Sequence, residues 1–468
     1  MKWSLFLKVI PGIDGAASQY VYSTLSSAAA LLPDAIEVRP GRRLEAGRLR
    51  AGLSDEQVRE LGEALILLPD DADEAALAEW LLQRQRYLTD KVYAVICTTL
   101  ACNSACAYCF QKTVREAGQM SGEVAVATAE WLVRTLDAQR PTRLVVMFTG
   151  GEPLLNPGPI YIIAERLGEY AVRRGIAFTP DLVTNGTLGL AEPVARISRW
   201  GRPSVQVTLD GPRDVHDRRR PLTSGGSSYE RIMRNLDLLP DSAKLAIRLN
   251  VDAQNLGALK QLVDELEARG LKDRAILSLS AVFETARCQH YRKNRLDGEA
   301  MDGLAQLTMQ CFRRGFMIDI FSGPGPCVAQ TEGGFAVSPE GDIYNCLHFL
   351  KFAQLKIGSV FSRQMTHAYP EVLTADPRDA ECMQCNLMPR CLGGCRAGAW
   401  WTKGSIAARV CERERLNRGL DCELRLEYLT AAMRREPGPA GLAGPAGTTG
   451  PTGPADPASL AGLAGGRS

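Results

Sequence analysis

Three cysteines stand within eight residues of one another in the first quarter of the chain. The stretch "CNSACAYC" carries Cys102, Cys106 and Cys109, and Tyr108 directly precedes the last of them. Three thiolates on one short segment can bind three corners of an iron–sulfur cube and leave its fourth iron open. A zinc site is one alternative, although only Cys97 offers a fourth ligand nearby. Buried free thiols are the other alternative.

A second group of cysteines lies near the carboxyl-terminal end. It contains seven members, in the order Cys327, Cys346, Cys382, Cys385, Cys391, Cys395 and Cys411. The chain has 14 cysteines and only four histidines, and so many thiols in a large cytosolic chain indicate metal or redox chemistry. A pair of zinc ribbons is the alternative interpretation of this group. We interpret the remaining cysteines as small buried hydrophobic side chains: Cys97, Cys288, Cys311 and Cys422.

Apolar runs alternate with helical patterns between residues 90 and 285. We expect strands at residues 92–99, 143–150, 178–186, 204–211, 245–252 and 275–283. Strands separated by helices predict βα units and a parallel sheet, either open or closed into an incomplete barrel.

Polar motifs follow the carboxyl ends of these strands. In chain order they are Gly150-Gly151-Glu152-Pro153, Thr184-Asn185-Gly186, Thr208 with Asp210-Gly211, and Asn250 with Asp252. The cysteine segment at residues 102–109 follows the first strand in the same way. Because the carboxyl ends of parallel strands share the edge at which ligands bind, we expect these residues to lie around one site.

The cysteine segment resembles the CxxxCxxC signature of radical S-adenosylmethionine (radical SAM) enzymes, in which an aromatic residue commonly precedes the last cysteine. The resemblance implies a [4Fe-4S] cluster on Cys102, Cys106 and Cys109, with S-adenosylmethionine (SAM) bound at the open iron. It also implies reductive cleavage of SAM to a 5′-deoxyadenosyl radical that abstracts hydrogen from a substrate. The implied SAM contacts are Tyr108, Gly150, Gly151, Glu152, Pro153, Asn185, Thr208, Arg220 and Asn250. Arg218 or Arg219 could replace Arg220.

The second cysteine group resembles the SPASM extension of radical SAM enzymes, from the Gly341-x4-Cys346 element to the CxxCx5CxxxC core. The resemblance implies two auxiliary iron–sulfur clusters, which we expect to be [4Fe-4S]. The distal cluster would be ligated by Cys382, Cys385, Cys391 and Cys411, and the nearer one by Cys327, Cys346 and Cys395. No further cysteine lies between Cys327 and Cys346. We therefore expect an open iron in the nearer cluster, available to a substrate thiolate or to His348.

Taken together, the patterns and the resemblance predict an α/β protein built around an incomplete (β/α)6 radical SAM barrel. We expect a small N-terminal α+β module at residues 1–85, the barrel at 86–310, a cysteine-rich SPASM domain at 311–430 and a disordered Gly/Pro/Ala-rich tail at 431–468. The tail has glycine at every third position, as in collagen, but the run is short. The N-terminal module resembles the opening strands of peptide-maturing members, so it either docks a leader peptide or stabilises the barrel as a lid.

Charge and hydropathy exclude several classes of protein. Lys and Arg number 55 against 53 for Asp and Glu, a formal net charge of +2, which argues against nucleic acid as a partner. No run approaches the roughly 18 apolar residues that a membrane span requires, and the amino-terminal segment lacks a signal-peptide pattern. We therefore expect a cytoplasmic protein that does not contact a membrane.

The resemblance also bears on the substrate, because SPASM enzymes mostly modify peptides and proteins. We expect a precursor peptide or protein substrate, an external electron donor such as flavodoxin or ferredoxin, and cross-linking or another C–H modification. One alternative is formylglycine formation, as in anaerobic sulfatase maturases. Those enzymes typically carry Asp directly after the cysteine equivalent to Cys346, where this chain has Leu347. A non-catalytic zinc-binding adaptor is the second alternative. Catalytic acid–base residues are unknown; Asp210, Glu284 and His348 are candidates by position.

Overall fold

The computed structural model describes residues 1–13, 15, 17–44, 52–88, 90–111, 118–282, 296, 298–319 and 325–434. Glu284, Cys288 and the glycine-repeat tail from residue 435 onward, which figure in the sequence predictions, lie outside these ranges. Among the helices that are described, none has the length and apolar character needed to cross a membrane.

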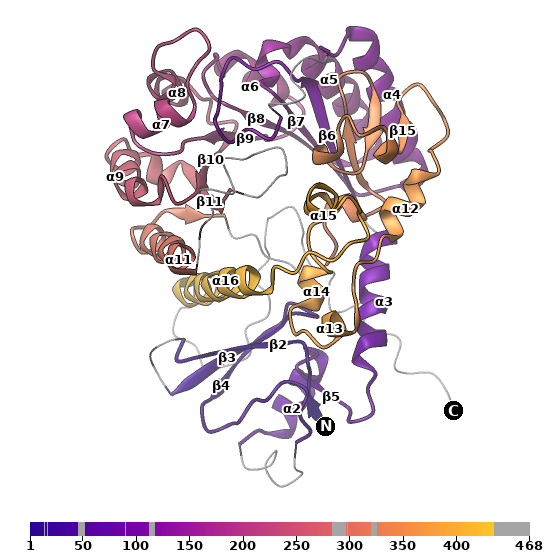
Figure 1. The fold of residues 1–468 in the computed structure, drawn as a ribbon, viewed down its shortest axis with the longest axis vertical. Helices are drawn as coiled ribbons and strands as arrows, with labels where there is room; N and C mark the ends of the chain where they lie inside the picture. Colours follow the sequence, from indigo (N-terminus) through magenta and orange to yellow (C-terminus); the bar gives the residue numbers. More distant parts are fainter. Residues whose placement is uncertain are drawn as a thin grey trace.

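Six parallel strands form the middle of a ten-stranded sheet (Figure 1). They are β6 (Lys91–Thr99), β7 (Arg143–Gly150), β8 (Ala177–Thr184), β9 (Ser204–Thr208), β10 (Lys244–Val251) and β11 (Ala275–Ala281). Each strand pairs in parallel with the next in sequence order. All six predicted strands and their parallel arrangement are therefore confirmed.

Helices cover the outer face of this sheet (Figure 1). The strands are connected through α4 (Gly122–Gln139), α5 (Pro157–Arg174), α6 (Ala191–Ile197), α7 (Arg213–Arg219), α8 (Ser228–Asp237) and α9 (Leu259–Ala268), and α11 (Gly298–Arg313) follows β11. Alternate strand residues, such as Val92, Ala94 and Ile96 of β6, are fully buried in the core that these helices share. The intervening residues are only partly buried, because they face the inner side of the curved sheet.

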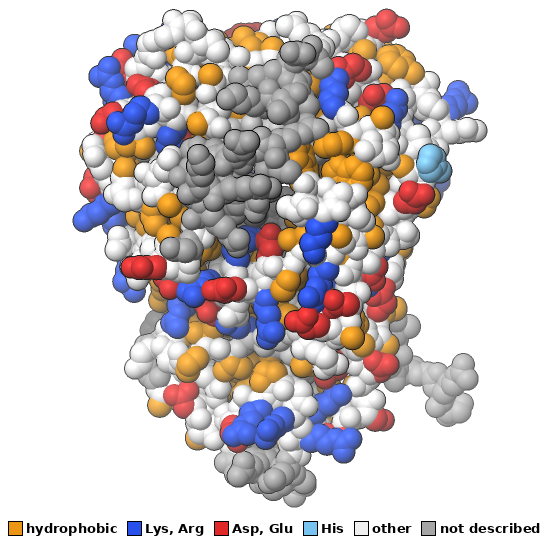
Figure 2. All heavy atoms as spheres, viewed as in Figure 1, with side chains coloured by type: hydrophobic (Ala, Val, Ile, Leu, Met, Phe, Trp, Pro, Cys, Tyr) orange, Lys and Arg blue, Asp and Glu red, His pale blue; other side chains and the backbone are white. Residues whose placement is uncertain are grey.

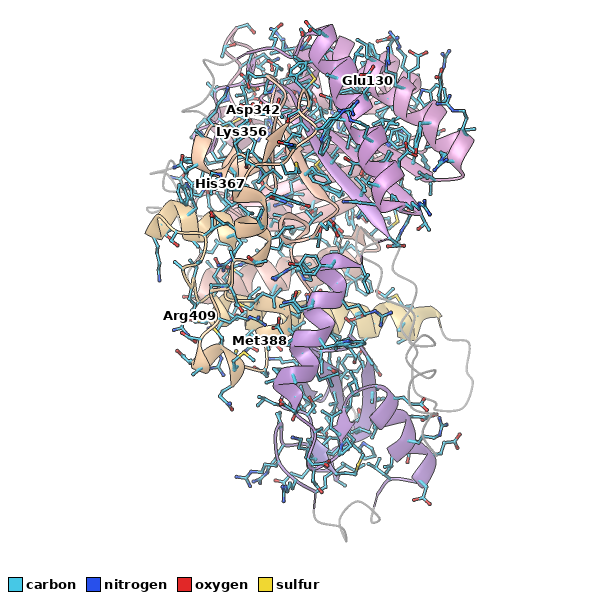
Figure 3. The ribbon with its side chains drawn as sticks, turned by 90° about the vertical axis from the view of Figure 1, so that its right-hand side faces the viewer. Glu130, Asp342, Lys356, His367, Met388 and Arg409 are labelled. Carbon is cyan, nitrogen blue, oxygen red and sulfur yellow. The ribbon has the colours of Figure 1, made fainter. Side chains whose placement is uncertain are left out.

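The cysteine-rich segment extends this same sheet beyond β6. It contributes β13 (Gly334–Val337), β14 (Asp342–Tyr344) and β15 (Gly358–Ser359), of which β13 is parallel to β6 and the other two are antiparallel to their neighbours. Lys356 and Asp342 form an ion pair at 2.5 Å beside this hairpin (Figure 3). At the opposite edge, β12 (Met317–Ile318) pairs with β11. These strands are too short to be predicted from periodicity. Strand β13 pairs with the edge of β6 and β12 with the edge of β11, where a parallel sheet offers unpaired backbone groups.

The N-terminal residues form a separate small sheet. Strands β2 (Leu7–Pro11), β3 (Ser18–Ser23) and β4 (Ala29–Pro33) are antiparallel, and β1 (Lys2–Trp3) pairs with β5 (Leu67–Leu68). Helix α2 (Asp55–Glu63) begins with the capping box that the sequence indicates, formed by Ser54 and Gln57. Helix α3 (Glu74–Tyr87) then leads to the barrel.

Short helices of the cysteine-rich segment lie between the N-terminal module and the barrel (Figure 1). They are α12 (Ala368–Thr374), α13 (Ala380–Met383), α14 (Met388–Cys391) and α15 (Arg396–Lys403), and the long helix α16 (Arg413–Arg434) follows. Met388 packs against α3 in a shared apolar cluster (Figure 3). Helix α16 contacts both the barrel and the N-terminal module. Arg418 pairs with Asp302 of α11 at 2.7 Å, and Asp421 pairs with Lys8 of β2 at 2.7 Å. The remaining helical turns are 3-10: η2 (Pro153–Leu155), η3 (Leu256–Ala258), η4 (Leu271–Asp273), η5 (Val328–Gln330), η6 (Leu347–Phe349) and η7 (Ala353–Leu355).

The surface agrees with the near-zero net charge. On the face shown in Figure 2, the Lys and Arg side chains of the described residues are interspersed with Asp and Glu side chains. Such mixing does not produce the broad basic surface that phosphate backbones require.

Candidate active site

The cysteine loop that follows β6 is fastened to the segment that follows α7. The Ala105 N–H donates to the Pro221 carbonyl at 2.8 Å, and the Thr223 N–H donates to the Asn103 carbonyl at 2.9 Å. These backbone hydrogen bonds cross more than a hundred residues of sequence. They hold the loop at the carboxyl edge of the parallel sheet, where the strand order predicts it.

The thiols of this loop lie close enough to influence one another. Burial raises the pKa of the Cys106 thiol, Arg220 lowers it, and Cys109 and Cys102 raise it again. Within the described ranges, however, no three His, Cys, Asp or Glu side chains converge as the ligands of a single metal ion must. Thiolates that hold an iron–sulfur cube each bind a different iron, so they need not converge on one point. Three thiols on one loop match the three corners of an iron–sulfur cube whose fourth iron is open.

Two glycines of the GGEP motif allow the end of β7 to touch the start of the cysteine loop. A Cβ atom on Gly150, whose φ is +145°, would lie 2.1 Å from the Thr99 carbonyl oxygen. A Cβ atom on Gly151 would lie 2.2 Å from the carbonyl oxygen of Ala101. Any side chain at either position would therefore displace the backbone that leads into the three cysteines.

Glu152 holds the ends of β7 and β8 together. Its carboxylate is completely buried and accepts hydrogen bonds from Leu154 N at 3.1 Å, Thr184 Oγ1 at 2.8 Å and Asn185 N at 2.7 Å. Burial raises the pKa of Glu152, and these three hydrogen bonds lower it. The next residue, Pro153, begins η2 and is also buried. The motif thus supplies a fixed, pre-oriented acceptor beside the cysteine loop.

Asn185, at the end of β8, reaches directly to the cysteine loop. Its Nδ2 atom donates to Asn103 Oδ1 at 2.7 Å and to Ser104 Oγ at 3.2 Å, and its Oδ1 atom accepts from Thr187 N at 2.9 Å. We did not predict roles for Asn103 and Ser104, although both lie inside the cysteine signature. Thr208 ends β9 and is 7% exposed, so little of its side chain is open to a ligand.

Tyr108 joins the loop to the ends of β9 and β10. Its hydroxyl donates to the buried carboxylate of Asp210 and accepts from Arg220 Nη1 at 2.6 Å and Asn250 Nδ2 at 3.2 Å. Burial raises the pKa of Tyr108, so the phenol stays protonated. The structure thereby brings three of the predicted SAM contacts, Tyr108, Arg220 and Asn250, into one hydrogen-bonded group.

The three consecutive arginines occupy different environments. Arg218 is exposed, whereas both Nη atoms of Arg219 bind the Asp252 carboxylate, at 2.9 Å and 3.0 Å. Arg220 bonds to the hydroxyl of Tyr108, which belongs to the cysteine loop. Of the three, Arg220 is therefore best placed to meet a ligand at the cysteine loop.

The cysteines of the second group divide into two sets. The pKa of Cys346 is raised first by burial and then by Cys327 and Cys395. The pKa of Cys391 is also raised first by burial, lowered by the N–H groups of Gly393 and Gly394, and raised again by Cys385 and Cys411. The remaining member, Cys382, accepts from Arg409 Nη1 at 3.9 Å (Figure 3 shows Arg409). Cys346 thus lies near Cys327 and Cys395, and Cys391 near Cys385 and Cys411. Their ligation of clusters stays a prediction.

A pair of tilted rings in contact connects the first cysteine loop with the second group. Phe110, directly after Cys109, packs on His348 with 4.3 Å between ring centroids. Burial lowers the pKa of His348 to about 4, so the imidazole is neutral at neutral pH. His348 lies in η6, which begins directly after Cys346. The nearer set of the second group therefore lies on the same side of the sheet as the first loop, a contact that sequence spacing does not reveal.

Comparison of the sequence with protein families gives one match that bears on the chemistry of the site. The family model of the radical SAM superfamily matches residues 96–266, from β6 through α9. This part of the chain is a radical SAM domain. Membership implies a [4Fe-4S] cluster and SAM, and the site offers the donors that these groups need: three thiols, the buried acceptor Glu152 and the cation Arg220.

Curated relatives of this radical SAM enzyme include two types of sulfatase-maturating enzyme. The serine-type anaerobic sulfatase-maturating enzyme of Klebsiella aerogenes is 26% identical over 322 residues, which cover 64% of this chain and 77% of the relative. The cysteine-type enzyme of Clostridium novyi is 22% identical over 324 residues, which cover 63% of this chain and 85% of the relative.

Two solved structures resemble the fold of the radical SAM enzyme. Native anSMEcpe with bound AdoMet has a TM-score of 0.59 at 18% identity and covers 73% of this chain and 100% of its own. Streptococcus suis SuiB bound to precursor peptide SuiA has a TM-score of 0.52 at 14% identity and covers 88% of this chain and 99% of its own. The predicted α/β fold with a radical SAM partial barrel is confirmed.

Proposed function

We infer that this radical SAM enzyme modifies a residue of a ribosomally made peptide or of a protein, by abstracting hydrogen from a C–H bond. The single observation that carries this proposal is the hydrogen bond between Arg220 and Tyr108, which places a guanidinium beside the three-cysteine loop at the carboxyl edge of the sheet. The three thiols of the loop would hold a [4Fe-4S] cluster. Such a cluster, with SAM bound, supplies the electron that splits the sulfonium and releases a 5′-deoxyadenosyl radical.

The protein's own side chains would bind and orient SAM. Glu152 presents a buried carboxylate to the cationic amino group, and Arg220 presents a guanidinium to the SAM carboxylate. Tyr108 and Asn250 keep that guanidinium in place through the shared hydroxyl. We propose that the other predicted contacts line the rest of the SAM site: Gly150, Gly151, Pro153, Asn185 and Thr208.

Two auxiliary clusters would occupy the second cysteine group. The proximity of Cys327, Cys346 and Cys395 supports the nearer cluster, and that of Cys385, Cys391 and Cys411 supports the distal one, with Cys382 as its fourth ligand. Whether His348 completes the nearer set is open to test by substitution.

A peptide substrate is supported by the relatives. The curated relatives are named for maturing sulfatases, and SuiB was solved with a precursor peptide. The N-terminal module has the three-stranded sheet of β2–β4, and β4 is an edge strand to which an extended leader could add. We propose that the module, residues 1–85, docks the leader in this way for the barrel at 86–310 and the SPASM domain at 311–430. An external carrier such as flavodoxin or ferredoxin would supply the electron, and the cytoplasm is the compartment that suits such a carrier.

Formylglycine formation is the competing function. The resemblance to both serine-type and cysteine-type maturases favours it. The presence of Leu347 after Cys346 favours a different C–H modification, since an aliphatic side chain cannot accept the substrate proton. The zinc-binding adaptor is disfavoured because the radical SAM match accounts for the GGEP motif, which an adaptor does not need.

The test is to incubate anaerobically reconstituted protein with SAM, a reductant and candidate peptides. We expect 5′-deoxyadenosine, together with a peptide that has lost hydrogen and does not react with a hydrazide. A hydrazide-reactive aldehyde would establish formylglycine instead. Release of 5′-deoxyadenosine with every peptide unchanged would argue against the peptide substrate, and no release under reducing conditions would remove the SAM chemistry.

A further inference from the structure

Arg396 is a buried arginine whose hydrogen bonds all go to backbone carbonyls. It is 4% exposed and is the first residue of α15. Its five N–H donors are directed at four residues: Gly393 at 2.8 Å, Gly394 at 2.7 and 3.2 Å, Ile406 at 2.6 Å and Ala408 at 3.3 Å. Neutral carbonyls satisfy the geometry of the guanidinium, but they do not neutralise its charge.

The four carbonyls come from two loops that carry cysteines of both proposed auxiliary sets. Gly393 and Gly394 lie between Cys391 and Cys395, whereas Ile406 and Ala408 precede Cys411. The loops also touch each other, since Val410 N donates to the Gly393 carbonyl at 3.0 Å.

The glycines make this contact possible. Gly394 has φ +95°, and a Cβ atom there would lie 2.1 Å from the Val410 carbonyl oxygen. Gly393 has φ +79°, and a Cβ atom there would lie 2.4 Å from Pro377 Cγ. The left-handed backbone at both positions lets two successive carbonyls face one guanidinium.

The charge of Arg396 is placed where a helix disfavours it. The N-terminus of α15 carries partial positive charge, so a cation in its first turn is destabilised. Arg396 directly follows Cys395, and its guanidinium binds the Gly393 and Gly394 carbonyls, two and three residues after Cys391. Those two cysteines belong to different proposed sets. Negative charge at the cysteines would therefore compensate the buried charge of Arg396.

We propose that Arg396 is a positioning residue that both auxiliary clusters share: its fork joins the two ligand loops, and its charge is the common counter-charge of the two clusters. The inference rests on the proposed function, because it requires iron–sulfur clusters at these cysteines. A fixed positive charge stabilises the more reduced, more negative form of a cluster. Arg396 thus raises the reduction potentials of both.

The experiment is a redox titration of both auxiliary clusters, followed by electron paramagnetic resonance. The parent background lacks the first cluster through Cys102→Ala, Cys106→Ala and Cys109→Ala, so that only auxiliary signals remain. Arg396→Gln removes the charge, Arg396→Lys keeps it without the fork, and Lys403→Gln is the matched control. Lys403 lies on the same helix and is exposed, and it donates to one carbonyl, that of Arg409, at 2.7 Å.

We expect Arg396→Gln to lower both potentials, with about a tenfold shift in each one-electron reduction equilibrium, or about 59 mV. Arg396→Lys and Lys403→Gln should stay near the parent values. Loss of both auxiliary clusters in Arg396→Gln, with retention in Arg396→Lys, would equally support the shared counter-charge.

Several results would overturn the inference. They are unchanged potentials in Arg396→Gln, a shift in only one cluster, or loss of the clusters in both Arg396 variants alike. Failure of the proposed function is distinguishable from these, because the parent protein would then contain zinc, or would lack auxiliary iron before Arg396 is changed.

Discussion

The Nη1 atom of Arg220 lies 2.6 Å from the hydroxyl oxygen of Tyr108. The same hydroxyl donates to the buried carboxylate of Asp210, so one phenol joins a cation and an anion. Tyr108 belongs to the cysteine loop, whereas Asp210 follows β9. This contact explains how the loop that carries Cys102, Cys106 and Cys109 is joined to a distant strand end by one hydrogen-bonded group.

Removal of that hydroxyl should loosen the site. In Tyr108→Phe, Asp210 loses a hydrogen-bond donor and Arg220 loses a hydrogen-bond acceptor. This loss should lower the free energy of unfolding by about 1–3 kcal/mol. We expect SAM affinity to fall roughly tenfold, since about 1.4 kcal/mol corresponds to that factor. Equilibrium binding of SAM to reconstituted protein measures the effect. Tyr161→Phe is the control, because its hydroxyl bonds to Glu192 at the surface, 2.9 Å away. Equal SAM affinities in the two variants would contradict the role of Tyr108.

The second prediction concerns the glycine that touches the cysteine loop. Gly151→Ala would place a methyl group 2.2 Å from the Ala101 carbonyl oxygen, so the loop must shift. We expect loss of about four irons per chain, the content of one cubane, together with loss of SAM cleavage. Gly158→Ala is a matched change in α5, where a Cβ atom meets nothing within 4 Å. Iron analysis of both variants checks this, and full iron in Gly151→Ala would show that the loop tolerates displacement.

Iron content also distinguishes cysteines that ligate a cluster from cysteines that are only packed in the core. Cys391→Ala should remove about four irons per chain, because it deletes a corner of the distal cluster. Cys422→Ala should keep the full iron content, since Cys422 packs on α11 with its Sγ atom 3.7 Å from the Ala305 carbonyl oxygen. Comparable iron loss in the two variants would refute the assignment of Cys391.

The fourth prediction concerns pH. Burial, followed by the charge of Glu423, raises the pKa of Glu427 from 4.5 to about 7, and Arg390 opposes this shift. The folded state therefore binds an extra proton between these values, so stability declines as pH rises through this interval and the full cost is present above pH 7.

Glu427→Gln should remove this cost. We expect the free energy of unfolding of the variant to exceed that of the parent protein by about 1–3 kcal/mol at pH 8, with a smaller difference at pH 5. Urea unfolding at both pH values checks it, and Glu371→Gln, at an exposed position of α12, is the control. A gain that is the same at the two pH values would show that Glu427 does not titrate in this range.

The parallel sheet could be predicted because each of its strands is a run of mostly apolar residues with helical stretches on both sides. The strands of the cysteine-rich segment could not, because β13 to β15 contain only two to four residues each. Strand β13 pairs with β6, more than two hundred residues away in sequence, and β14 and β15 then add to β13 in turn.

The chemistry-bearing residues could be chosen from spacing, but their mutual contacts could not. Cysteine spacing and the GGEP motif indicate which residues matter. The sharing of one hydroxyl by Arg220 and Asn250, the pairing of Arg219 with Asp252 and the burial of Arg396 depend on how loops meet in the fold. For this reason the sequence named Arg220 but left Arg218 and Arg219 as possible replacements, whereas in the structure Arg220 is the arginine that bonds to Tyr108.

The most direct test of the central claim compares the parent protein with its Cys102→Ala, Cys106→Ala, Cys109→Ala variant after anaerobic reconstitution. The measurement is 5′-deoxyadenosine formed from SAM under reducing conditions, alongside iron content. The account predicts cleavage by the parent with about twelve irons per chain, and no cleavage by the variant with about eight. Zinc in place of iron in the parent, or SAM cleavage that persists in the variant, would contradict it.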